Sequence, residues 1–203
     1  MGLAHRARDG GDIAAAARVL RDLEDDDVLA GGLGYGGVCL TPVRRGPNAD
    51  VPWQGIAAVT GLLDDTTPRH LLDISDPTDL FRAVDSGIDL ISASAPFVAA
   101  AASVVYTNDG PLRIADQDCA DSPHLLDPDI TGFSEAFLHR LDRVEPATAR
   151  TIRTAHNEGF LIELAHRIRA SIADDAYPRF RDEFLERYSG NQPAESGRRL
   201  QNN

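Results

Sequence analysis

Apolar residues in the first half of the chain alternate between helical spacing and short continuous runs. Three segments have apolar positions every three to four residues, as an amphipathic helix does, and three short runs between them are typical of buried strands. We expect helices over 12–24, 54–63 and 76–87, and strands over 28–33, 70–74 and 88–94. Because strands and helices alternate, the pattern predicts parallel β/α units.

The helix expected over 76–87 has the strongest local signals of the six elements. Asp76 is a suitable N-cap, Pro77 fits the first helical position, and Asp79 places negative charge in the first turn. Gly87 follows as a residue that ends the helix easily.

From residue 95 the pattern changes. Residues 95–107 are apolar and favour a β-strand, and the turn sequence Asn108-Asp109-Gly110 follows them. Residues 115–130 are polar and irregular, and the remainder is mostly helical. We expect helices over 133–145, 147–155, 157–173 and 178–188, and a disordered polar tail over 189–203.

The composition fits a water-soluble protein. The chain has 203 residues, of which 42% are hydrophobic, enough for a substantial core. No apolar run is long enough to span a membrane, and the first residues lack the apolar region of a secretion signal. The two cysteines, Cys39 and Cys119, form no C-x-x-C pair. These features predict a cytoplasmic protein with no membrane association.

The charge of the chain is strongly acidic. The formal net charge is −12, every one of the 20 basic residues is arginine, and aspartate is three times as frequent as glutamate. This balance is typical of a salt-tolerant organism or of a GC-rich genome, and both interpretations stay open. It argues against phosphate binding by the overall field, but a local arginine-lined surface is compatible with it.

Three segments, taken in order, resemble the C-terminal half of the tRNA-guanine transglycosylases, the queuine or archaeosine tRNA-ribosyltransferases. They are the glycine-rich run 31–36, the segment 68–96, and the segment 155–172 followed by 180–188. The resemblance covers about residues 13–188 and implies a (β/α)₈ barrel with a zinc-binding insertion. It implies a base exchange in which an aspartate attacks the ribose C1′ of a tRNA guanosine, guanine leaves and a 7-deazaguanine enters.

A complete barrel of this type takes about 250 residues. We therefore expect the chain to contribute α/β units of a partial TIM-type (β/α)₈ barrel, followed by a mostly helical C-terminal region. One domain is expected over 1–188, with the disordered tail after it.

The glycine-rich run matches the loop that helps to form the base pocket in the resembling family. The matching residues are Gly31, Gly32, Leu33 and Gly36, whereas Gly37 stands where the family usually has an acidic residue. Glycines allow the backbone to approach a flat base closely. The run is either a remnant of a guanine-binding loop or a tight turn after a strand.

Ser92 occupies the position of the nucleophilic aspartate. The run from Gly87 to Pro96 matches the family pattern G-(V/I)-D-(M/L)-F-D-x-x-x-P without a gap. Asp89 is retained, but it is not the family's nucleophile. A serine hydroxyl has no charge to stabilise an oxocarbenium-like centre, and no histidine lies nearby in sequence to activate it. The alternative is that Ser92 is a small residue that closes the end of the barrel.

The zinc ligands implied by the resemblance are three cysteines and a distant histidine. The cysteine positions carry Leu125, Asp127 and Ile130, and the histidine is His156, which precedes Asn157. Because two of three thiolates are replaced by apolar residues, we expect that the family's zinc is lost. On this interpretation the core is repacked and His156 is a hydrogen-bonded histidine at a helix cap.

A replacement metal site is the alternative for this region. Cys119, His124, Asp127 and His156 are ligand types that bind zinc, but their spacing matches no known site.

Arginines are frequent in the last helices, where the resembling family contacts tRNA phosphates. They either bind phosphate or pair with nearby Glu163, Asp182, Glu183 and Glu186. The residues concerned are Arg167, Arg169, Arg179, Arg181 and Arg187.

Three hypotheses for function follow. The chain is a non-catalytic transglycosylase relative that binds an active subunit or tRNA, half of a split enzyme completed by an N-terminal chain, or a decayed fragment without activity. The combined loss at 92, 125 and 130 favours the first and third. Whether the base would be of the queuine or archaeosine type stays open.

Overall fold

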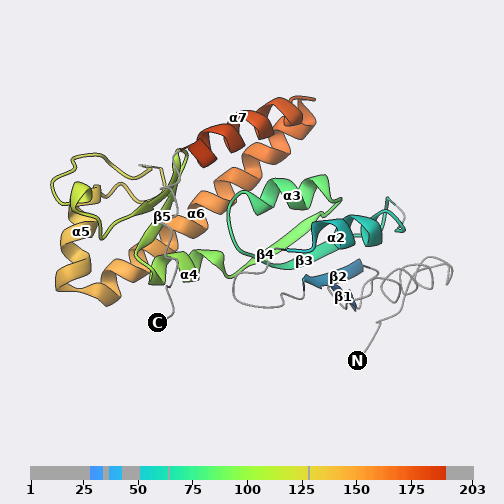
Figure 1. Ribbon diagram of the computed structural model, residues 1–203, viewed down its shortest axis with the longest axis horizontal. Coiled ribbons are helices and arrows are strands. Elements are labelled where there is room, and N and C mark those ends of the chain that lie inside the picture. Colours follow the sequence, from blue (N-terminus) through green and yellow to red (C-terminus); the bar gives the residue numbers. More distant parts are fainter. Residues whose placement is uncertain (1–27, 34–36, 43–50, 64, 128, 191–203) are drawn as a thin grey trace, which may run out of the picture. The chain divides into compact units, whose positions relative to one another are not determined.

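The computed structural model describes residues 28–33, 37–42, 51–63, 65–127 and 129–190. The chain divides into two compact units, Met1–Ala95 and Pro96–Asn203 (Figure 1). The helix expected over 12–24 and the residues 191–203 of the expected tail lie outside the described residues. The first two residues of that tail, 189 and 190, belong to a helix. None of the described helices is long and apolar enough to cross a membrane.

The first unit contains a four-stranded sheet in the order β1-β2-β3-β4. β1 and β2 are antiparallel, whereas β2, β3 and β4 are parallel to one another. The strands are β1 (Val28–Leu33), β2 (Gly37–Pro42), β3 (Arg69–Ile74) and β4 (Leu90–Ala93).

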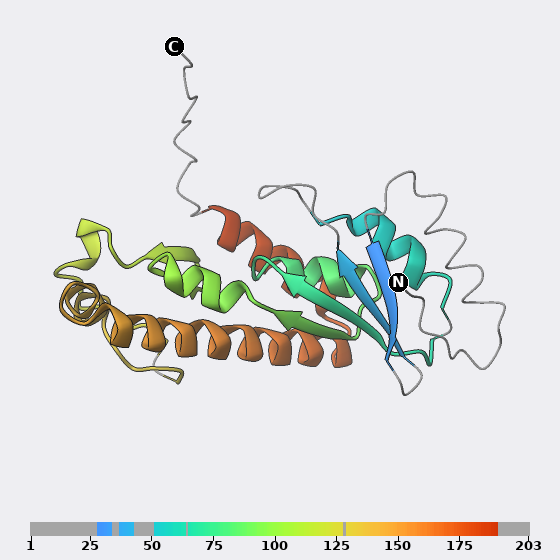
Figure 2. The same ribbon diagram turned by 90° about the horizontal axis from the view of Figure 1, so that it is seen from below.

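Two helices, α2 (Trp53–Thr60) and α3 (Asp79–Asp85), connect the parallel strands. Both lie on the same face of the sheet (Figures 1 and 2). Ile56 and Phe81 from these helices and Leu40 and Leu71 from the strands are all fully buried. Burial of these apolar side chains holds the helices to the sheet.

The predicted parallel β/α unit from β3 through α3 to β4 is confirmed, and so is the expected helix before it, α2. The arrangement is compatible with part of a TIM-type barrel, and the four described strands do not close one. The strand expected over 28–33 is confirmed as β1, but its expected place in the parallel part of the sheet was wrong. Residues 28–33 do not lead into a helix and a parallel strand but pair antiparallel with 37–42, a strand that the sequence pattern did not predict.

The signals around α3 are confirmed in part. Asp79 lies in the first turn, but the N-cap is Thr78 and not Asp76, and the helix begins after Pro77. Asp76 Oδ1 accepts a hydrogen bond of 2.8 Å from the backbone N–H of Thr78. Asp79 Oδ2 accepts one of 3.0 Å from the N–H of Ser75. Gly87 follows the helix with φ of 76°, a conformation that glycine adopts without steric cost.

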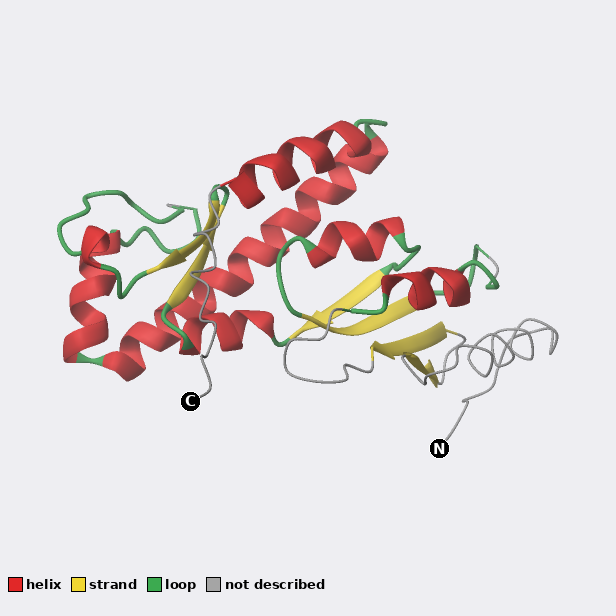
Figure 3. Cartoon of the chain, in the orientation of Figure 1, coloured by secondary structure: helices red, strands yellow, loops and turns green. Residues whose placement is uncertain are grey.

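The second unit is mostly helical and carries a two-stranded antiparallel sheet (Figure 3). A 3₁₀ turn, η1, covers Gln117–Cys119. The other elements are α4 (Ala95–Ala101), β5 (Val104–Thr107), β6 (Gly110–Arg113), α5 (Glu135–Val144), α6 (Pro146–Ala173) and α7 (Tyr177–Gly190).

The predicted strand over 95–107 was wrong in its first half. Residues 95–101 form α4, because alanine has the highest helix propensity and this segment contains four alanines. Ser103, with φ of 58°, lies between the end of this helix and β5. The turn predicted at 108–110 is confirmed, since Thr107 pairs with Gly110.

The two helices predicted over 147–155 and 157–173 are one continuous helix, α6. The predicted break falls at His156 and Asn157, two polar residues with buried side chains in the middle of the helix. These residues do not end the helix because they form hydrogen bonds to other elements.

Val105, Ile114, Leu126 and Leu138 form the apolar core of the second unit. They come from β5, from the segments before and after η1, and from α5. Leu112, Leu141 and Ile152 pack against this cluster. The irregular segment 115–130 is therefore joined to the core at both ends.

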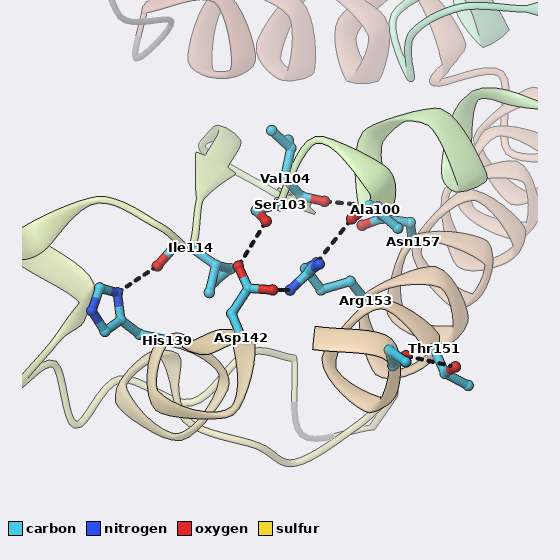
Figure 4. Close-up of polar contacts among 10 residues, drawn as sticks. Ala100, Ser103, Val104, Ile114, His139, Asp142, Thr151, Arg153 and Asn157 are labelled. Atoms are coloured by element: carbon cyan, nitrogen blue, oxygen red, sulfur yellow. Dashed lines mark hydrogen bonds and ion pairs between the residues drawn. The ribbon is translucent and has the colours of Figure 1, made fainter. Parts of the chain in front are cut away.

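A buried ion pair connects α4, α5 and α6 (Figure 4). The Arg153 guanidinium, 3% exposed, lies 2.6 Å from Asp142 Oδ1 and donates through Nε to the carbonyl oxygen of Ala100 at 3.0 Å. The Ser103 hydroxyl donates to the other oxygen of Asp142 at 2.7 Å. Both charged groups thus have hydrogen-bond partners, as burial requires.

We expect Arg153→Met to destabilise the protein by about 3 kcal/mol, because it leaves the Asp142 carboxylate without its partner. The measurement is the free energy of unfolding in urea. Arg150→Met, at an exposed position of the same helix, is the control and should change stability little. Equal stability of the two variants would contradict this role of the ion pair.

Candidate functional site

One face of the sheet in the first unit carries the candidate site. Cys39, His70 and Leu90 are cross-strand partners and therefore share this face. Ser92 lies two residues beyond Leu90 and also faces this way. α2 and α3 cover the opposite face, and no described helix of this unit covers this one (Figure 2). Leu90 is accordingly 51% exposed.

Ser92 is hydrogen-bonded to a histidine from the neighbouring strand. The distance from its Oγ to Nε2 of His70 is 2.9 Å, and Ser92 is exposed whereas His70 is partly buried. The sequence expectation was that no histidine lies near Ser92 along the chain, and the parallel pairing of β3 with β4 brings one there. A hydroxyl that donates to an imidazole is the arrangement of a nucleophile with its general base.

The Ser92–His70 pair lacks two further parts of a nucleophilic site. Within the described residues, the side chain of His70 makes one hydrogen bond, which is to Ser92. No described carboxylate therefore orients the ring. The pair is also uncharged when the imidazole is neutral, so it offers no anion to a developing positive centre.

A carboxylate lies at the end of β3, at a position that the sequence analysis did not single out. Asp73 adopts φ of 65° at a break in the register between β3 and β4. Its Oδ1 accepts a hydrogen bond from the hydroxyl of Ser94. The signal in the sequence is an aspartate inside an otherwise apolar strand pattern, where a polar residue marks an irregularity.

Asp89 has a structural role. Its Oδ2 accepts a hydrogen bond of 2.9 Å from the backbone N–H of Arg69, and its own N–H donates to the carbonyl of Arg69 at 2.9 Å. These two bonds fix the start of β4 against the start of β3. Asp89 is retained in the sequence pattern, and its side chain is occupied by this backbone contact.

The structure places the glycine-rich run in a strand. Gly31, Gly32 and Leu33 belong to β1 and pair with Cys39, Val38 and Gly37. Gly36 lies outside the described residues. No described contact joins these residues to Ser92, so their assignment as a base-binding loop stays a prediction.

His156 is buried in α6, and both of its ring nitrogens bond to protein. Nε2 lies 2.8 Å from the carbonyl oxygen of Tyr106, and Nδ1 lies 3.3 Å from the hydroxyl of Thr131. Since a carbonyl only accepts, Nε2 carries the proton and Nδ1 accepts from Thr131. Burial lowers the pKa of His156, which favours this neutral form. The expectation of a hydrogen-bonded histidine is met, but at mid-helix and not at a cap.

Asn157 completes the contact between α6 and β5. Its Oδ1 accepts a hydrogen bond of 2.9 Å from the N–H of Tyr106, and its Nδ2 donates to the carbonyl of Val104 at 3.0 Å (Figure 4). His156 and Asn157 together therefore bond both backbone groups of Tyr106. The sequence analysis named this pair, but it did not predict that the two residues bind a strand.

The three positions that align with zinc-binding cysteines do not form a ligand set. Leu125 is 58% exposed. Asp127 Oδ1 accepts from the N–H of Asp129 at 3.0 Å. Ile130 packs against Gly159, where a built Cβ would lie 2.6 Å from Ile130 Cγ2.

The alternative ligand set of Cys119, His124, Asp127 and His156 is likewise not assembled. Throughout the described ranges, no group of three or more His, Cys, Asp or Glu side chains is placed to hold a metal ion. Cys119 is buried, and its Sγ lies 3.6 Å from the carbonyl oxygen of Arg113. Burial, followed by the nearby carboxylates of Glu135, Asp116 and Asp118, raises the pKa of this thiol to about 11.

Most of the arginines of the last helices have protein partners. Arg167 Nη1 donates to Asn108 Oδ1 at 2.9 Å, and its guanidinium lies 5.0 Å from the ring centre of Phe180. Arg187 Nε donates to the backbone carbonyl of Asn108 at 2.9 Å. These contacts hold the β5–β6 turn against α6 and α7.

The remaining arginines lie along α6 and α7. Arg179 pairs with Glu183 at 3.8 Å, and Arg181 with Asp182 at 2.9 Å. Arg169 is exposed on α6 and has no ion pair within the described part of the chain. The structure thus favours protein pairing for most of the set and leaves phosphate binding as a prediction.

The fold and the site define a class: parallel β/α units with a helical C-terminal part, in which catalytic groups are expected at strand ends. The sequence model of one family, described as queuine tRNA-ribosyltransferase, matches residues 15–190 of the chain. The chain belongs to this family. The resemblance seen in the three sequence segments is thereby confirmed.

Individual relatives agree with this assignment. A queuine tRNA-ribosyltransferase of Dehalococcoides mccartyi is 29% identical over 174 residues, which are 83% of this chain and 44% of the relative. One of Desulforudis audaxviator is 29% identical over 178 residues, 82% of this chain and 46% of the relative. One of Caulobacter vibrioides is 26% identical over 163 residues, 78% of this chain and 44% of the relative. The chain therefore spans somewhat under half the length of the curated relatives it matches.

We expect Cys119 to react slowly with alkylating reagents. At pH 8, iodoacetamide should alkylate Cys119 at least about 100-fold more slowly than an ordinary exposed thiol, because a pKa near 11 leaves few thiolates. The measurement is the rate of mass gain in Cys39→Ser, which retains Cys119 alone. The same variant in urea is the control and should react quickly, whereas fast reaction in the native state would contradict burial of the thiol.

We expect Asn157→Ala to destabilise the protein by about 2 kcal/mol, because it leaves backbone groups of Tyr106 and Val104 buried without partners. Thermal unfolding measures the effect. Glu158→Ala, at the exposed neighbouring position, is the matched control. If both variants melt at the same temperature, the side chain of Asn157 does not hold β5.

Proposed function

We propose that this chain is a non-catalytic member of the queuine tRNA-ribosyltransferase family that acts as an accessory subunit in 7-deazaguanine modification of tRNA. The observation that carries the proposal is the residue at the nucleophile position. Ser92 stands where the family pattern has aspartate, and its hydroxyl is bonded to His70 at 2.9 Å.

The chemistry of base exchange explains why this replacement matters. The attacking group must hold the ribose at C1′ and must then leave when the new base enters. A carboxylate does both, because it is a good nucleophile and a good leaving group. A serine bonded to C1′ would form an O-glycoside with a poor leaving group, so exchange would stop at that intermediate. Ser92 is thus unsuited to turnover even with His70 as its base.

The face of the sheet on which no described helix of this unit lies supports binding of a further protein chain. Faces of parallel sheets are normally covered on both sides. Leu90 is 51% exposed there, and β4 lies at the edge of the sheet described for this unit. We propose that a transglycosylase chain that carries the catalytic carboxylates covers this face.

Half of a split active enzyme is the second candidate function. The His70–Ser92 pair, which joins neighbouring strands, and the Asp73 carboxylate near the end of β3 favour it. On this alternative, a complementary chain would complete the barrel, and residues of both chains would take part in catalysis.

The experiment measures transfer of labelled guanine into unmodified tRNA. The purified chain alone should transfer none, in both the wild-type form and Ser92→Ala, because neither offers a carboxylate at position 92. Guanine transfer by the chain alone would contradict the accessory role. Activity that appears only with a second chain and disappears in Ser92→Ala would contradict the accessory role and support the split enzyme.

Partner binding is tested by capture on the tagged full chain. Mass spectrometry identifies the transglycosylase chain that is captured. Leu90→Glu should weaken capture by about tenfold, which corresponds to a loss of about 1.4 kcal/mol in binding free energy. Val144→Glu, at a residue that is 69% exposed in the other unit, is the control and should bind normally. Without capture of a transglycosylase chain or binding of tRNA, both proposed functions are wrong.

A further inference from the structure

The segment that aligns with the family's zinc-binding cysteines, from Leu125 to Ile130, is held in place by its own backbone and by apolar contacts. We call it the aligned segment. The carbonyl of Asp127 accepts from the N–H groups of Ile130 and Thr131, each at 3.1 Å. The N–H of Leu126 donates to the carbonyl of Phe133 at 2.9 Å. The Leu126 side chain, 3% exposed, belongs to the apolar core of the unit.

Ile130 contacts α6 at the one residue of that region that has no side chain. A Cβ built on Gly159 would lie 2.6 Å from Cγ2 of Ile130, closer than real carbon atoms approach. Glycine inside a helix costs about 0.5–1 kcal/mol relative to alanine. Its presence in the middle of α6 is explained by the close approach of Ile130. Because isoleucine is β-branched, its side chain has little rotamer freedom to move aside.

The donor chemistry of the same region does not fit a metal. His156 uses both ring nitrogens for Tyr106 and Thr131, so a metal would have to displace one of these bonds. Leu125 and Ile130 have no ligand atoms. A closed zinc site needs four ligands, and the aligned positions supply at most two.

We infer that in this chain the aligned segment docks on α6 through Ile130 and Gly159, and that the second unit folds without zinc. The Ile130 side chain, seated on Gly159, provides the link between segment and helix that a metal provides in a metal-bound insertion. This inference concerns folding and is independent of the proposed accessory function.

The first test is metal content and its effect on stability. The full chain, purified from cells grown with added zinc and without chelators, should contain far less than one zinc per molecule by elemental analysis. Neither EDTA nor added zinc should shift its melting temperature. A stoichiometric zinc ion, or a melting temperature that falls with EDTA, would overturn the inference.

The second test is a double-mutant cycle on the docking contact. Gly159→Ala should lower the melting temperature by several degrees, because the new methyl group collides with Ile130. In the Ile130→Ala background the same substitution should be neutral or stabilising, because the collision is gone and alanine favours the helix. The sign of the effect thus depends on Ile130.

Gly190→Ala is the matched control, because a Cβ at that helical position would meet nothing within 4 Å. It should leave the melting temperature unchanged or raise it slightly. If Gly159→Ala behaves like this control, or has the same effect with and without Ile130, the segment does not dock in this way and the inference is wrong.

Discussion

The second unit depends on how the backbone of β5 is satisfied. A two-stranded sheet leaves the outer N–H and C=O groups of each strand without strand partners, and such groups cannot be buried unpaired. Here α6 supplies them from side chains: Asn157 bonds the N–H of Tyr106, and His156 bonds its carbonyl. This requirement explains why two polar residues lie buried in the middle of a 28-residue helix.

The same hydrogen bonds occupy the ring nitrogens of His156. Because His156 is bonded on both sides, it is committed to the strand and to Thr131. About one turn from His156 in either direction along α6, Gly159 receives Ile130 and Arg153 joins Asp142 to the end of α4. Through these contacts α6 stabilises the irregular segments that pack on it.

In the first unit, α2 and α3 pack on one face of the sheet. The other face, on which no described helix of this unit lies, carries His70 and Ser92. The membership in the queuine tRNA-ribosyltransferase family is clear from the match over residues 15–190. What distinguishes this chain is the chemistry at one position of that fold. Ser92 lies where the family pattern has aspartate, and its hydroxyl is hydrogen-bonded to His70.

The local pattern of the sequence determined the β/α unit of β3, α3 and β4, the position of Gly87 after α3, and the presence of serine at position 92. These features depend on residues close together in the chain, where propensity and spacing are informative. Only the tertiary structure decided the antiparallel pairing of β1, the continuity of α6, and the contacts of His70 with Ser92 and Ile130 with Gly159. Each of these depends on residues distant in sequence, and their pairing follows from packing and from the need to satisfy buried backbone groups.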